Sequence, residues 1–169
     1  SSEIADFWSM LQGFQTSGKC IEKAHYRIRY MKSFRPLSIK EDIEFKEARP
    51  ILYLNTAAVA SLFNSRNAGS TSNRSNWSTI MSYLKSHASY LGLKQDRFTI
   101  LLPSGLPDYT IDIVNGEQVK KVKVNRPKAL CFDYLQLKET FGLDLETEVV
   151  AENQEEIPTE SNAIDLQQF

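Results

Sequence analysis

The residue types that most often carry catalysis are sparse in this chain. Its 169 residues include only two histidines, His25 and His87. His25 lies in a segment where cations alternate with apolar residues, and His87 lies in a predicted helix between serines. A nucleophile and its base have to meet through hydrogen-bonding geometry, which neighbouring positions on one helix do not provide. We therefore expect both histidines to be ordinary surface or boundary residues.

Acids, cysteines and glycines do not add a recognisable reactive site. Asp108, Asp112 and Asp133 show no spacing typical of a metal site or of an acid–base pair. Cys20 and Cys131 form no CxxC motif and lie beside apolar residues, which favours buried free thiols in a reducing compartment. No glycine is followed by the Lys-Ser/Thr of a phosphate-binding loop. We expect no catalytic residue, no metal site and no cofactor, and hence no enzyme.

The charges are distributed more informatively than their total suggests. Twenty Lys and Arg against 21 Asp and Glu give a net charge of −1. Nine of the acids, but no Lys or Arg, follow residue 138, so the first 138 residues carry 20 − 12 = +8. A basic body and an acidic tail predict different partners, and the body's sign suits nucleic acid.

The sharpest basic feature follows the dipeptide Asn115-Gly116. This pair is a strong hairpin signal, because both residues tolerate the positive φ angles of a tight turn. The strand expected after it carries five cations and no acid: Lys120, Lys121, Lys123, Arg126 and Lys128. A protruding cationic hairpin is what a DNA-contacting wing requires. The alternative is an exposed edge strand on which lysines discourage aggregation.

A predicted helix over residues 76–90 supplies the second candidate surface. One face of it combines short hydroxyls with cations: Arg74, Ser75, Ser78, Ser82, Lys85 and Ser89. Short hydroxyl side chains allow close approach to a phosphate backbone or to base edges. The alternative is a solvated polar face. The predicted nucleic-acid-binding residues are thus Arg74, Ser78, Ser82, Lys85, Lys120, Lys121, Lys123, Arg126 and Lys128.

A third basic segment precedes these two. Arg27, Arg29, Lys32 and Arg35 interleave with aromatic side chains (Tyr26, Tyr30 and Phe34). Such a pattern suits stacking on single-stranded nucleic acid. The alternative is that these aromatic side chains face the core.

The elements that position these residues indicate an α+β fold. We expect a helix up to Ser17-Gly18, an extended pair over residues 20–54 with Pro50 at an edge or bulge, and a helix over 56–64. A polar loop, 64–76, precedes the helix at 76–90, which we expect to stop near Gly92. Strands follow at 98–102, 109–114, 119–124 and 129–132, then a short helix at 134–141. Helix, loop, helix and basic hairpin are the parts of a winged helix-turn-helix, here with additional β-hairpins.

The predicted organisation is one folded body and one tail. Residues 1–146 form the body, with an N-terminal helix and hairpin in 1–54 and the helix-turn-helix and wing in 55–146. Residues 147–169 are acidic, rich in glutamine and poor in large apolar residues, which predicts a tail without a core. No apolar run approaches the roughly 18–20 residues of a membrane span, and the start has no signal-peptide pattern. We expect a cytoplasmic protein that is a fragment of a longer one.

Several stretches resemble the C-terminal winged-helix region of primase-helicase proteins from Bacteroides-type mobile elements and phages. The resemblance rests on Asn76-Trp77-Ser78-Thr79-Ile80-Met81-Ser82-Tyr83-Leu84-Lys85, Tyr90-Leu91-Gly92, Arg97-Phe98, Ala129-Leu130-Cys131-Phe132-Asp133-Tyr134-Leu135 and Phe141-Gly142-Leu143-Asp144-Leu145-Glu146. The opening Ile4-Ala5-Asp6-Phe7-Trp8 is similar to the helix that joins such domains to the ATPase. No Walker motif or primase acid cluster is present, so the family's catalytic activities do not carry over.

The resemblance implies an accessory domain that helps a larger replication protein engage DNA, duplex or single-stranded. An alternative is a protein-interaction module that docks to its own helicase ATPase domain or to a replication partner. In that case the acidic tail is the recruiting or autoinhibitory element. The tail's last residues, Ile164-Asp165-Leu166-Gln167-Gln168-Phe169, are loosely similar to those of bacterial single-strand-binding proteins, without the proline before the last Phe.

Overall fold

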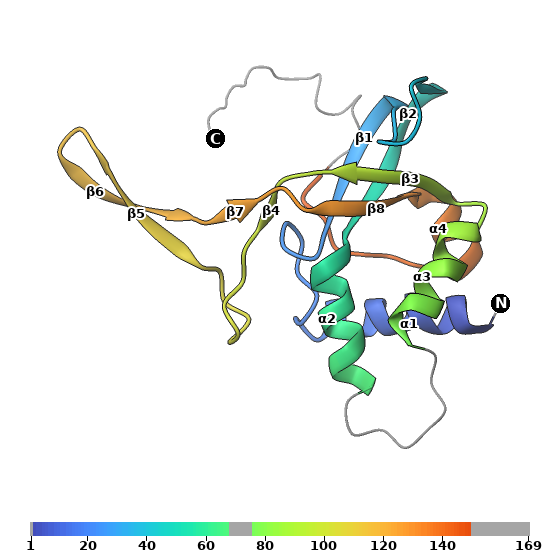
Figure 1. The fold of residues 1–169 in the computed structure, drawn as a ribbon, viewed down its shortest axis with the longest axis horizontal. Coiled ribbons are helices and arrows are strands. Elements are labelled where there is room, and N and C mark those ends of the chain that lie inside the picture. Colours follow the sequence, from blue (N-terminus) through green and yellow to red (C-terminus); the bar gives the residue numbers. More distant parts are fainter. Residues whose placement is uncertain (1, 68–75, 150–169) are drawn as a thin grey trace.

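The fold is mixed α+β, with helices on one face of an antiparallel sheet (Figure 1). The computed structural model describes residues 2–67 and 76–149. The four strands of the main sheet are β1 (Tyr26–Phe34), β2 (Ile43–Asn55), β3 (Tyr90–Gln95) and β8 (Lys128–Asp133). They lie in the order β1-β2-β8-β3 and are antiparallel throughout.

The helices of the described residues bury one face of this sheet. They are α1 (Ser2–Thr16), α2 (Thr56–Asn67), α3 (Trp77–Ser86) and α4 (Tyr134–Phe141). As the sequence periodicity predicts, α1 buries Ile4, Phe7, Trp8 and Leu11. Together the helices enclose the sheet residues of alternate positions, among them Leu52, Leu54, Leu130 and Phe132, in one core.

The other face of the sheet has a smaller core of its own. Phe34, Ile51, Tyr53, Phe98 and Cys131 are buried there. The C-terminal end of β1 covers these residues. Four residues of β2, 45–48, are opposite the single residue Lys32 of β1, and an irregularity of this kind bends the hairpin. The bend carries the chain across to the opposite edge of the sheet. Leu37 N donates to Leu93 O of β3 at 2.9 Å, so the connection that follows β1 contacts the outer strand β3.

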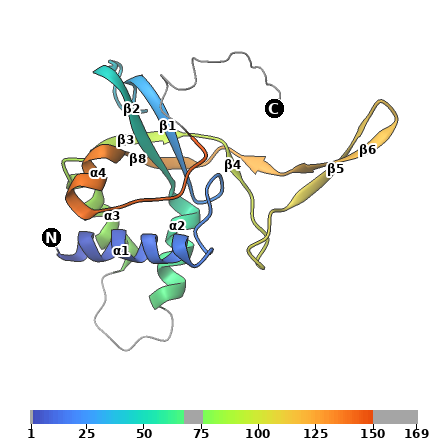
Figure 2. The same ribbon diagram turned by 180° about the vertical axis from the view of Figure 1, so that it is seen from behind.

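A long hairpin projects from the body between β3 and β8 (Figures 1 and 2). Its base is the pair β4 (Phe98–Thr99) and β7 (Val124–Asn125), and its outer part is the pair β5 (Tyr109–Val114) and β6 (Glu117–Val122). Asn115 and Gly116 form the turn with φ angles of 53° and 80°, as the sequence predicts. Residues 100–108 form an extra loop in the ascending side, closed by a bridge between Leu101 and Pro107.

Two predicted elements differ in the structure. The helix expected over 76–90 ends at Ser86, and Tyr90–Gln95 is the edge strand β3, which the sequence interpretation missed. Gly92 is not a helix stop. It occupies an irregularity opposite β8 with φ of 128°, and Pro36 lies against it so closely that an added Cβ would be 2.5 Å from Pro36 Cβ. Consequently Ala88, which falls within the expected helix, is exposed and not helical.

The proline of the first hairpin lies where the sequence predicts, and the chain after α4 packs back against the body, including Thr147 and Glu148 of the predicted tail. Pro50 lies in β2 where β1 is its neighbour and β8 has already ended, which is locally an edge position. After α4, Leu143 and Leu145 are buried, and the Tyr26 hydroxyl donates to Glu146 O. The Glu22 carboxylate accepts hydrogen bonds from Thr147 Oγ1 and from Glu148 N. The rest of the predicted tail, from residue 150, lies outside the described residues.

Candidate nucleic-acid interface

Helix α3 presents three of the predicted contact residues to solvent. Ser78, Ser82 and Lys85 are exposed, and the Ser82 hydroxyl donates to Ser78 O at 3.2 Å. The helix begins at a cap in which Asn76 Oδ1 accepts from Thr79 N at 2.9 Å. Ile80 and Leu84 fix the orientation of the helix, because both are buried against the core. Arg74 and Ser75 lie outside the described residues.

Ser89 does not belong to this face, contrary to the prediction. It follows the end of α3, its side chain is fully buried, and its hydroxyl lies 2.8 Å from His87 Nδ1. This is a serine–histidine contact at the end of a helix, and the buried hydroxyl cannot reach a substrate. The pair stabilises the connection from α3 to β3.

The hairpin has two different faces. In the β5–β6 ladder Tyr109 stands opposite Val122 and Ile111 opposite Lys120, so these four share one face with Ile113. Ile111 and Ile113 are 58% and 72% exposed, since no part of the described chain covers this face. Lys120 is the one cation of the face, and its Nζ lies 4.3 Å from the centroid of the Tyr109 ring.

The opposite face of the hairpin holds two ion pairs. Lys121 Nζ is 3.2 Å from Asp112 Oδ2, and Lys123 Nζ is 3.3 Å from Asp108 Oδ2. The predicted strand of unopposed cations is therefore only partly correct. The segment 120–128 contains no acid, but the paired strand β5 and the loop before it supply two. Before any ligand binds, Lys121 and Lys123 are therefore paired with carboxylates and not solvated by water alone.

Arg126 and Lys128 lie where the hairpin joins the sheet. Both are exposed, and neither has an acidic partner within the described residues. Lys128 opens β8 opposite Gln95. The Arg126 carbonyl accepts a hydrogen bond from Gln95 Nε2 at 3.3 Å, which holds this junction to the edge of β3.

The structure does not bring the two predicted surfaces together. Helix α3 and the hairpin lie toward opposite ends of the molecule's long axis, with α2 between them (Figures 1 and 2). Lys85 and Lys120 therefore belong to separate surfaces. Lys120, Lys121 and Lys123 share the projecting hairpin, whereas Arg126 lies at its junction with the sheet and Lys128 is the first residue of β8.

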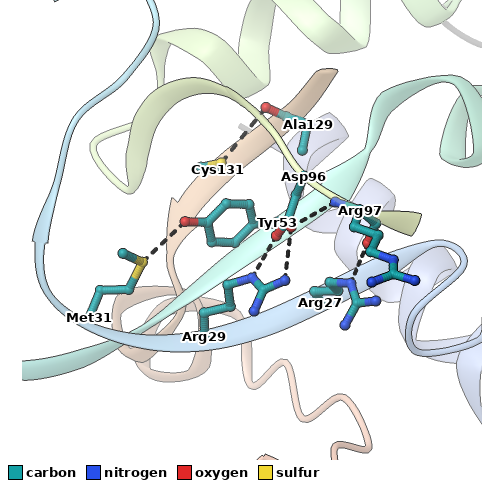
Figure 3. A network of polar contacts seen from close by, with 8 residues as sticks. All are labelled: Arg27, Arg29, Met31, Tyr53, Asp96, Arg97, Ala129 and Cys131. Atoms are coloured by element: carbon teal, nitrogen blue, oxygen red, sulfur yellow. Dashed lines mark hydrogen bonds and ion pairs between the residues drawn. The ribbon is translucent and has the colours of Figure 1, made fainter. Parts of the chain in front are cut away.

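The third basic segment is organised around an acid that the sequence interpretation missed. Asp96 accepts Arg29 Nε at 2.6 Å, Arg29 Nη2 at 2.8 Å and the amide of Arg97 at 2.7 Å (Figure 3). Burial alone would raise the pKa of Asp96, but these hydrogen bonds outweigh burial and lower it. Arg27 Nε donates to Arg97 O, so β1 is tied to the chain just after β3.

The aromatic residues of that segment do not form a free stacking surface. Tyr26 and Phe34 are buried in the two cores, as the core-facing alternative holds. Arg35 pairs with Asp42 at 2.7 Å, and Lys32 remains exposed. Among the hydrogen bonds of the described residues, Arg27 donates only through its Nε, to the carbonyl of Arg97.

Cys20, Cys131 and His25 are buried. Burial raises the pKa of the Cys20 thiol to about 12 and also raises that of Cys131, so neither is a ready nucleophile at neutral pH. Burial lowers the pKa of His25, whose Nδ1 accepts from the amide of Ile21 at 3.0 Å. Among residues 2–67 and 76–149, no three His, Cys, Asp or Glu side chains gather as a metal site would need.

An apolar groove of about 850 Å³ separates α2 from the base of the hairpin. Leu62, Ile100, Leu102 and Leu106 line it together with the residues around His25. Leu106 is 65% exposed.

In the described part of the chain, no helix is both long and apolar enough to cross a bilayer.

Comparison with known proteins gave no match of any kind. No protein-family model matches the chain, and neither a curated protein nor a solved structure is similar to it.

Proposed function

We propose that this chain is a non-catalytic DNA-binding accessory domain of a cytoplasmic replication primase-helicase from a mobile element or phage. The observation that carries the proposal is the long hairpin, which projects away from the body (Figure 1). Its returning side bears Lys120, Lys121 and Lys123, and Arg126 and Lys128 follow where it joins the sheet; all five are exposed. A two-stranded ribbon has the dimensions to enter the major groove. Lysine and arginine contacts to phosphates then bind duplexes regardless of their sequence.

The arrangement of elements supports a winged-helix assignment. Helices α2 and α3 precede β3, and the hairpin follows as the connection from β3 to β8. In this proposal the hairpin is the wing and α3, with Ser78, Ser82 and Lys85, is a second contact surface. Because the two lie toward opposite ends of the long axis, we assign the main contact to the hairpin. The wing cations are Lys120, Lys121, Lys123, Arg126 and Lys128, and Arg74 before α3 remains a proposed contact.

The ion pairs on the hairpin are compatible with this role. The Lys121–Asp112 and Lys123–Asp108 pairs are exposed to solvent, with lysine side chains about half accessible. Exposed pairs contribute only about 0–1 kcal/mol each. Each lysine can therefore exchange its carboxylate for a phosphate at little cost. Asp112 and Asp108 still weaken the field of the hairpin, which favours modest affinity that is steeply sensitive to salt.

The test is charge reversal on the hairpin. Lys120→Glu, Lys121→Glu and Lys123→Glu are introduced together, and binding of labelled duplex and single-stranded DNA is followed by fluorescence anisotropy at about 50 and 200 mM salt. A matched control reverses Lys32, Lys40 and Lys46, three exposed lysines of the β1–β2 hairpin. We expect the hairpin variant to lose duplex binding and the control to retain it. Unchanged affinity in the hairpin variant would refute the wing assignment.

A second candidate function is a protein-interaction module, and the uncovered apolar face of the hairpin favours it. Ile111 and Ile113 are exposed beside Tyr109, an arrangement more typical of protein contacts than of phosphate contacts. The partner would be its own helicase ATPase domain or another replication protein, with the acidic tail recruiting it or occupying the basic face. The failure of every nucleic acid to bind the full chain at low salt would favour this candidate over the first.

A further inference from the structure

Four arginines from three separate segments converge where the hairpin leaves the body. Arg27 and Arg29 come from β1, Arg97 follows β3, and Arg126 precedes β8. We call these four residues, with Asp96 between them, the arginine cluster. Arg126 is one of the predicted contact residues, and Arg27 and Arg29 belong to the third basic segment, whereas no sequence pattern singled out Arg97.

The one carboxylate of the cluster is already satisfied. Asp96 is engaged by both ends of the Arg29 fork and by the Arg97 amide, and its side chain is 9% exposed. A bidentate contact of this kind uses the carboxylate's favoured acceptor positions. Asp96 therefore uses three of its roughly four acceptor positions, and its single negative charge offsets only one of the four arginines.

Arg27 and Arg97 point the same way (Figure 3), and neither is ion-paired with an acid within the described residues. In the same part of the chain, Arg27 donates only through its Nε, to the carbonyl of Arg97, which leaves both terminal nitrogens of its guanidinium group available to donate. Burial, followed by the like charges of Arg29 and Arg97, lowers the pKa of Arg27 despite the nearby carboxylate of Asp96. Cations held this close destabilise one another unless an anion joins them.

The strand register adds Arg126 to the group. Gln95 is paired with Lys128, and Phe98 is paired with Asn125. The strand pairing therefore keeps the same register across the residues between these two pairs. Asp96 N also donates to Pro127 O at 3.3 Å, in the same register. Arg97 is therefore directly opposite Arg126, and like charges at such positions repel.

The acids that border the cluster are engaged elsewhere. Glu22 accepts hydrogen bonds from Thr147 and Glu148, and Glu148 pairs with Lys23 at 3.3 Å. Glu22 adds one negative charge near Arg27, while Lys23 and Glu148 cancel. With Glu22 counted, the arginines still outnumber the acids by two.

We infer that Arg27, Arg97 and Arg126 form a binding site for phosphate oxyanions, occupied by backbone phosphates of a nucleic-acid strand that continues from the hairpin onto the body. Guanidinium groups suit this ligand because each presents parallel N–H donors to two phosphate oxygens. The assignment of the ligand rests on the proposed function. The phosphate chemistry of the site rests on the cluster itself.

The test uses the full chain with Arg97→Gln and Arg126→Gln combined. Both side chains are exposed and make no side-chain hydrogen bond within the described residues, so the variant is expected to fold. A control combines Arg66→Gln with Lys46→Gln, two exposed cations away from the cluster. Binding of a labelled single-stranded oligonucleotide is measured against salt. Losing two phosphate contacts should raise Kd roughly tenfold and reduce the salt slope by about 1.4, while the control stays at wild-type values.

A second arm separates this site from the proposed function. The melting temperature is measured with inorganic phosphate and with chloride at equal ionic strength. If oligonucleotides bind equally to the cluster variant and the control, the site is refuted, and the lysine reversal on the hairpin still decides the function. If no nucleic acid binds but phosphate stabilises the wild type and not the cluster variant, the phosphate site stands and the DNA-binding function is refuted. If no nucleic acid binds and phosphate does not stabilise the wild type, both the phosphate site and the DNA-binding function are refuted.

Discussion

Replacing Asp96 with asparagine removes one negative charge from the centre of the arginine cluster and leaves its shape intact. The carboxylate accepts three hydrogen bonds, two from Arg29 and one from the amide of Arg97. The bonds from Arg29 join the middle of β1 to the end of β3, the two outer strands of the sheet. Asp96→Asn should therefore weaken the connection between these two outer strands, and not only a contact at the surface.

The expected loss of unfolding free energy is about 2 kcal/mol. Asparagine has one acceptor oxygen, so one charge-assisted hydrogen bond is lost, which contributes about 1.5–3 kcal/mol. Breaking a fully buried pair would cost about 3–5 kcal/mol. The Arg29 side chain is 43% exposed, however, so water continues to solvate the unpaired guanidinium group and the loss stays below that range.

The assay is urea unfolding followed by tryptophan fluorescence, in which 2 kcal/mol corresponds to a midpoint shift of roughly 1 M. The matched control is Asp42→Asn, which removes the Arg35 pair, where both side chains are more than a third exposed. That variant should change stability by less than about 1 kcal/mol. Because the folded-state pKa of Asp96 is lowered, its stabilisation is present above the ordinary carboxyl pKa of about 3.9 and is lost as pH falls through the lowered value. Equal midpoint shifts in the two variants, or a difference that does not shrink as the pH falls below the ordinary carboxyl pKa of about 3.9, would refute the reasoning.

Two further predictions concern backbone geometry and a buried histidine. Gly92→Ala should cost about 2–4 kcal/mol in urea unfolding, since φ is 128° and the new Cβ would meet Pro36, whereas Gly13→Ala in open space on α1 should stabilise by about 0.5–1 kcal/mol. Destabilisation by both would contradict this account. Burial lowers the pKa of His25, so the folded state binds fewer protons than the unfolded one and stability should fall as pH drops below about 6.5. His25→Gln should flatten this slope by up to about 1.4 kcal/mol per pH unit, and an unchanged slope between pH 7.5 and 5.5 would count against it.

Local signals predicted much of the fold. The apolar periodicity of α1 and the Asn115-Gly116 turn are determined by residues a few positions apart, and both agree with the structure. Strand β3 was missed because Gly92 was interpreted as the stop of the preceding helix. Its strand conformation depends on β8 and on Pro36, which are distant in sequence.

The candidate site was predicted less completely for the same reason. The sequence indicates which residues are cations but not which acids oppose them, and Asp112 reaches Lys121 only through the strand pairing of the hairpin. No sequence pattern singled out Arg97, which directly follows an acid, Asp96. Extending the pairing inward from the turn would not have placed it opposite Arg126, because the extra loop at 100–108 changes the register between tip and base.

The position of β8 has a consequence for how the protein is made. β8 is the last strand of the described residues, yet it lies between β2 and β3 in the sheet. While a ribosome is still synthesising residues before Lys128, β2 and β3 have no strand to join them, and Leu52 and Leu54 lack the apolar neighbours that Leu130 and Phe132 later provide. The contacts that complete the sheet close about 75 residues of chain, the kind of pairing that forms slowly. The four-stranded sheet of a nascent chain therefore cannot be completed until β8 has emerged, and a chain that ends before β8 lacks the strand that joins β2 to β3.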